Sequence, residues 1–69
     1  MSRHATPEDF ARWEAQASQM TDEALRYVMT DATAAMLACA THDAVAEGFY
    51  ADQVHTFGRE WYRRRGGLT

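Results

Sequence analysis

The chain has 69 residues, a net charge of −3 and an apolar fraction of 46%, which indicates one small folded domain over residues 1–69. Its single cysteine, Cys39, excludes an internal disulfide. The longest mainly apolar stretch, residues 32–40, is too short to span a bilayer, and the first residues lack the apolar segment of a signal peptide. We therefore expect a cytoplasmic protein without a membrane segment.

The first expected helix covers about residues 7–19. Thr6 is suited to cap its free amides, and Pro7 loses nothing at the first helical position. Phe10, Trp13 and Ala17 then follow at spacings of three and four residues, which places them on one helix face. This face predicts packing against the rest of the chain, and Trp13 is suited either to cover the other helices or to reach a partner.

The second expected helix covers about residues 22–40. Thr21 is a capping residue, and two acids follow it at the positive end of the helix dipole. Leu25, Val28 and Ala32 begin an apolar stripe that continues through small side chains. The small side chains favour a close neighbouring helix.

The third expected helix covers about residues 43–65, with Asp43 as its cap. Its apolar stripe recurs every three or four residues, and its last turn is rich in arginine. Gly66 and Gly67 are expected to end it. The stripe consists of Tyr50, Val54, Phe57 and Trp61.

The three segments predict an all-α fold: a short N-terminal helix plus an antiparallel helical hairpin. Chains below roughly 70–80 residues usually gain stability from disulfides, a metal or oligomerisation, so we expect a homodimeric helical bundle. Phe57 and Trp61 are expected to be buried across the dimer interface. The predicted core and dimer residues are Leu25, Val28, Ala32, Tyr50, Val54, Phe57 and Trp61.

Charge is distributed unevenly along the sequence. Between His4 and Gly58 there are nine carboxylates against two arginines, a net charge of −7, whereas four of the seven basic residues lie in the last eleven positions. An acidic body of this kind is suited to a protein partner, including one that normally holds nucleic acid. The predicted partner-binding residues are Asp22, Glu23, Tyr27, Asp31, Glu47, Phe49, Asp52 and Tyr62.

No catalytic, cofactor-binding or metal site is predicted. Cys39 and His42 have a spacing that zinc sites use, but a structural zinc site needs four ligands, and His4 and His55 lie far away in the sequence. Cys39 lies on an apolar helix face, where a reactive thiolate is disfavoured. We therefore expect a protein that is not an enzyme.

Arg63, Arg64 and Arg65, next to Trp61 and Tyr62, form the strongest basic feature. They are candidates for contacting an anion, and a small nucleic-acid-binding dimer is an alternative function. The acidic balance argues against it. Alternatively, the arginines would stabilise the negative end of the helix dipole, or would pair with carboxylates of a partner or of a second subunit.

Three segments carry a resemblance: TDEALRYVM at residues 21–29, DAVAEGFY at residues 43–50 and WYRRR at residues 61–65. With the chain's length and plan, they resemble small early proteins of temperate bacteriophages, in particular phage-encoded anti-quorum-sensing anti-activators.

The resemblance implies a phage protein that acts in the host bacterial cytoplasm. It implies binding to the DNA-binding domain of a LuxR-type transcriptional activator, loss of that activator's DNA binding, and inhibition of the type IV pilus assembly ATPase. An adaptor protein without inhibitory activity is a further alternative.

Overall fold

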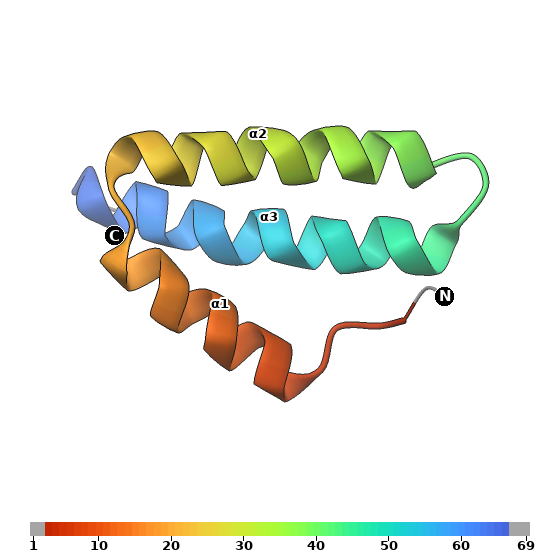
Figure 1. Cartoon of the computed structure of the whole chain (residues 1–69), viewed down its shortest axis with the longest axis horizontal. Helices are drawn as coiled ribbons and strands as arrows, with labels where there is room; N and C mark the ends of the chain where they lie inside the picture. Colours follow the sequence, from red (N-terminus) through yellow and green to blue (C-terminus); the bar gives the residue numbers. More distant parts are fainter. Residues whose placement is uncertain (1–2, 67–69) are drawn as a thin grey trace.

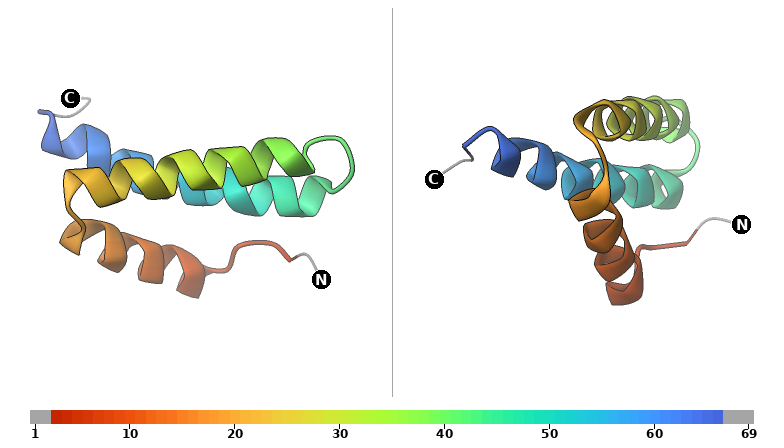
Figure 2. Two further views of the ribbon diagram at one scale, coloured as in Figure 1. Left: turned by 45° about the horizontal axis from the view of Figure 1, so that its top comes forward. Right: turned by 60° about the vertical axis from the view of Figure 1, so that its left-hand side comes forward.

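The computed structural model describes residues 3–66 and contains three helices: α1 (Pro7–Gln19), α2 (Asp22–Cys39) and α3 (Ala44–Arg64). No strand occurs within these residues, so the all-α prediction is confirmed. Each helix boundary lies within one residue of the expected position. Helices α2 and α3 lie side by side and antiparallel, and α1 runs obliquely beneath α3 (Figures 1 and 2).

Each helix begins at a residue whose side chain accepts a hydrogen bond from a free backbone amide. The Thr21 hydroxyl accepts from the amide of Ala24 at 3.1 Å, and the Asp43 carboxylate accepts from that of Ala46 at 3.0 Å. After α3, Gly66 has a φ of +92°, a backbone conformation that favours glycine. Gly67, the second expected stop residue, lies outside the described residues.

The core is built from all three helices. Trp13 and Ala17 of α1, Leu25 of α2 and Phe57 of α3 are buried together. Trp13 therefore covers the hairpin, one of its two expected roles. Burying Leu25 and Phe57 stabilises the fold by ~1.5–3 kcal/mol each.

One detail of the predicted dimer needs correction. Phe57 is 2% exposed within a single chain, so it has no surface left for a dimer interface. The covering element is α1, which packs against the hairpin through Trp13. Of the other predicted core residues, Leu25 and Ala32 are buried, and the remaining four are partly buried: Val28, Tyr50, Val54 and Trp61.

A buried carboxylate organises the start of α1. Asp9 is 2% exposed, accepts from the backbone amide and the hydroxyl of Thr6, and is ion-paired with Arg3 and Arg12. The Thr6 hydroxyl accepts in return from the Asp9 amide, which completes a capping box. The Arg3 guanidinium first, and then the Thr6 amide, hold the pKa of the Asp9 carboxyl well below its usual range.

The stability of the protein should therefore fall as acid protonates Asp9. Because the folded-state pKa of Asp9 is lowered, its contribution is present above the unfolded-state pKa of about 3.9 and is lost as pH falls through the lower folded-state value. Asp9→Asn should lower the urea midpoint at neutral pH and reduce its decline between about pH 5 and pH 2. Circular dichroism melts in urea measure both effects.

Glu8→Gln is the matched control, because Glu8 lies beside Asp9 in the same helical turn but is exposed. It should leave the pH dependence close to that of the unaltered chain. If the urea midpoints of Asp9→Asn and of the unaltered protein declined in parallel as the pH fell, Asp9 would not be the group whose protonation lowers the stability.

Candidate functional site

The arginines at the end of α3 are part of the fold. Arg64 donates to the Ala17 carbonyl of α1 at 2.9 Å, to Asp22 of α2 at 3.1 Å and to Glu60 of α3 at 2.7 Å. One guanidinium thus joins all three helices. Its partner on α1 is a carbonyl of the last turn, which also accepts from the Met20 amide at 3.3 Å.

The two flanking arginines use the same carboxylates. Arg63 is ion-paired with Glu60, and Arg65 donates to Asp22 at 2.9 Å while its guanidinium carbon lies 3.3 Å from the Trp61 ring centroid. Hydrogen bonds from the arginines lower the pKa of Glu60 to about 2, with Arg63 as the largest cause. Those from Arg64 and then Arg65 lower the pKa of Asp22.

This arrangement changes the interpretation of the basic end. Two carboxylates offset three guanidinium groups, and the basic groups bind acids of their own chain. A phosphate would have to displace these intramolecular contacts.

Three of the predicted partner-binding residues form one row. Glu23, Tyr27 and Asp31 lie four residues apart on α2, so they share one helix face, and all three are exposed. Tyr27 is the most prominent, with 74% of its surface exposed. Tyr27 lines two surface hollows. Thr30 also lines the first, and Met20 also lines the second. We call Glu23, Tyr27 and Asp31 the α2 row.

The other predicted partner-binding residues lie outside the row. Asp22 lines one of the hollows beside Tyr27, but its carboxylate is held by the arginine contacts described above. Phe49 packs on the core, with its ring centroid 5.3 Å from that of Trp13 and with Arg3 over its face. Glu47 and Asp52 lie on α3, away from the α2 row. The structure thus places three of the eight in the α2 row and a fourth, Asp22, beside it.

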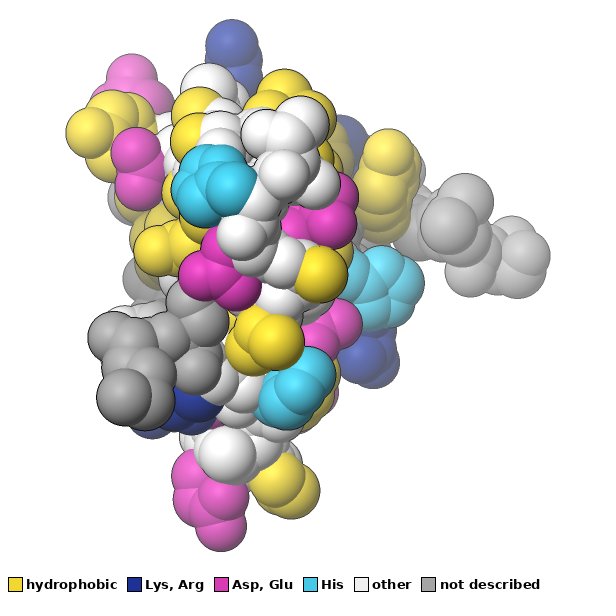
Figure 3. Space-filling view, turned by 90° about the vertical axis from the view of Figure 1, so that its right-hand side faces the viewer, with side chains coloured by type: hydrophobic (Ala, Val, Ile, Leu, Met, Phe, Trp, Pro, Cys, Tyr) yellow, Lys and Arg dark blue, Asp and Glu magenta, His cyan; other side chains and the backbone are white. Residues whose placement is uncertain are grey.

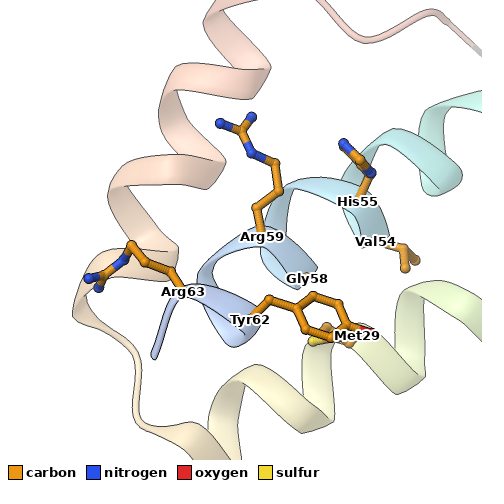
Figure 4. A pocket seen from close by; sticks show the side chains of 7 residues that line it. All are labelled: Met29, Val54, His55, Gly58, Arg59, Tyr62 and Arg63. Carbon is orange, nitrogen blue, oxygen red and sulfur yellow. The ribbon is translucent and has the colours of Figure 1, made fainter. Parts of the chain in front are cut away.

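Tyr62, the last of the eight, lines a separate groove that we call the α3 groove. Its volume is about 550 Å³, and Figure 4 shows its side chains. The lining residues are Met29 of α2 and Val54, His55, Gly58, Arg59, Tyr62 and Arg63 of α3.

Sequence reasoning did not find this groove as a site. The available signal was the recurrence of positions 54, 58 and 62 on one helical face with a glycine in the middle. A Cβ built on Gly58 would lie 3.7 Å from the Met29 methyl carbon. The absence of a side chain there keeps the floor of the groove open.

Among residues 3–66, no group of three or more histidine, cysteine or acidic side chains is arranged to hold a metal ion. Figure 3 views the end of the molecule that carries the α2–α3 turn, where the histidines form separate patches between acidic and apolar side chains. None of the described helices is both long enough and apolar enough to cross a membrane.

No protein-family model matches this chain, and no curated protein or solved structure is significantly similar to it.

Proposed function

We propose that this protein is a non-enzymatic inhibitor that binds the DNA-binding domain of a transcriptional activator through the α2 row. The observation that carries the proposal is the exposed Tyr27 with a carboxylate one helical turn away on each side. Among the described residues, neither Glu23 nor Asp31 takes part in an ion pair, so both charges are available to a partner.

The chemistry of this row suits the surface that a DNA-binding domain presents to its operator. Such a domain displays lysines and arginines for phosphate contacts. Carboxylates on a rigid helix complement those cations, which speeds encounter more than it adds affinity. Tyr27 adds an exposed aromatic side chain of the kind that contributes much of the binding energy at interfaces.

The resemblance to phage anti-activators makes a LuxR-type regulator the first partner to test. On the same resemblance, we propose that the protein acts in the host bacterial cytoplasm and that the type IV pilus assembly ATPase is a second target. The α2 row supports binding to a basic protein surface in general, and the resemblance supplies the identity of these partners.

The proposal predicts that a molar excess of the protein releases a LuxR-type activator from its operator. Fluorescence anisotropy of a labelled operator duplex measures the release. The double variant Glu23→Lys/Asp31→Lys should lose the effect, because it presents cations to a basic surface. The matched control Glu47→Lys/Asp52→Lys makes the same charge change on α3 and should still release the activator.

Two results would refute the proposal. One is operator binding that stays unchanged at any excess of the protein. The other is equal loss of release in both double variants, which would show an effect of net charge rather than of the α2 row.

We also propose that the chain forms a homodimer through the second half of the outer face of α2. Leu37 is 65% exposed there, and the small side chains of Ala34 and Ala38 on either side would let a second helix approach closely. Asp31 lies one helical turn before Ala34, so this contact would border the α2 row.

The dimer proposal predicts that Leu37→Glu yields a monomer, because two glutamates would face each other across the two-fold axis. Leu37→Met should remain dimeric, since it keeps an apolar side chain of similar volume. Light scattering after size-exclusion chromatography measures the mass of each variant. An unaltered chain that is monomeric at its highest soluble concentration would exclude the dimer.

A further inference from the structure

We propose that the α3 groove is a second docking surface, which binds an acidic amphipathic helix of another protein. The groove differs in charge from the rest of the molecule. The chain carries ten carboxylates, but none of them lines this groove, whereas two arginines and a histidine do. This apolar groove of an acidic protein therefore has cationic side chains and no carboxylate in its lining.

The groove has an apolar side and a cationic side. Figure 4 shows the Tyr62 ring extending over Met29 toward α2, with Val54 on the same side, while Arg59 and His55 point away from α2. A helix with one apolar stripe and one acidic flank matches both sides when it lies along α3. This is the helix-in-groove mode of recognition, in which apolar anchors recur every three or four residues.

Arg59 is the cation most available to a partner. Its nearest carboxylate oxygen, on Glu14, is 3.9 Å away, and 67% of the Arg59 side chain is exposed. An exposed pair at this distance contributes little to stability. Arg63, by contrast, donates to Glu60 at 2.9 Å through Nε. A carboxylate on the partner would thus pair with Arg59 at small cost to the fold.

The dimensions of the groove also suit a helix. Its lining runs from Val54 to Arg63, which corresponds to about 14 Å along the axis of α3. Between two and three turns of a partner helix would cover this length.

A second copy of this chain fits the groove less well. Two copies with antiparallel α3 helices, related by a two-fold axis across the groove, would bring their cationic sides together. Like charges in contact oppose such a pairing, whereas an acidic helix neutralises them.

This inference does not depend on the α2 row. Met29 and Tyr27 are two residues apart, so their side chains leave α2 about 200° apart around the helix axis. The two surfaces therefore face different directions, and substitutions in one leave the other intact.

A synthetic probe tests the proposal. The probe is a fluorescein-labelled 15-residue peptide with leucines at positions 1, 4, 8 and 11 and glutamates flanking them, and a second peptide carries lysines in place of the glutamates. Anisotropy with the full chain should show binding of the glutamate peptide and about tenfold weaker binding of the lysine peptide. In a ¹⁵N NMR titration, the largest amide shifts should fall on Met29, Val54, Gly58 and Tyr62.

Arg59→Glu should weaken binding of the glutamate peptide about tenfold. Arg26→Glu is the matched control, because it makes the same charge change at an exposed site outside the groove, and it should bind as the unaltered chain does. Circular dichroism melts of both variants show whether the fold is kept. Tyr62→Ser tests the apolar side, since Tyr62 is 55% exposed and can be replaced without opening the core.

Several results would overturn the proposal: no binding of the glutamate peptide, equal binding of the lysine peptide, or amide shifts that fall on the α2 row. Groove amides that shift with protein concentration in the absence of peptide would show that a second copy occupies the groove instead. All of these outcomes are independent of whether the protein releases an activator from its operator.

Discussion

The arrangement of the three helices depends on the contacts of one guanidinium group. Arg64 of α3 bonds to the last turn of α1 through the Ala17 carbonyl, to the first turn of α2 through Asp22, and to Glu60 of its own helix. These contacts close the end of the molecule where α1 turns into α2. The apolar core beside them contains few side chains, with Leu25 and Phe57 the largest that are fully buried. Directional charged hydrogen bonds add geometric specificity to this small core.

The same contacts decide which charged surfaces remain for function. Because Asp22 and Glu60 are held by the terminal arginines, the basic end is largely neutralised within the chain. An acidic row with an exposed aromatic ring stays free on α2, and an apolar groove flanked by the exposed Arg59 lies on another face of the hairpin. The two surfaces have opposite charge and face different directions. A small protein with such surfaces is suited to bind protein partners, and we infer that it acts by covering a basic surface of its target.

The local structure could be predicted from the sequence, because caps and helical periodicity are short-range signals. Thr6, Thr21 and Asp43 all cap the helices as expected. The charge pattern was harder to interpret, since a linear sequence does not show that Asp22 lies beside Arg64 and Arg65, more than forty residues later. Phe49 was expected at the surface because it lies off the main stripe, but α1 supplies a second packing face that brings Trp13 onto it. The α3 groove likewise depends on how α2 and α3 pack.

The most direct test of this account is the urea midpoint of Arg64→Met compared with that of Arg63→Met. Both variants remove one arginine from the same helix end and keep an apolar stem, but only Arg64 contacts all three helices. We predict that Arg64→Met loses much more stability, with a melting temperature lower by about 4 °C or more. Arg63→Met should change little, because the Arg63 side chain is exposed and Glu60 keeps its bond to Arg64. Equal and small effects of the two substitutions would show that the arginines are not part of the scaffold, and the basic end would again be a candidate binding surface.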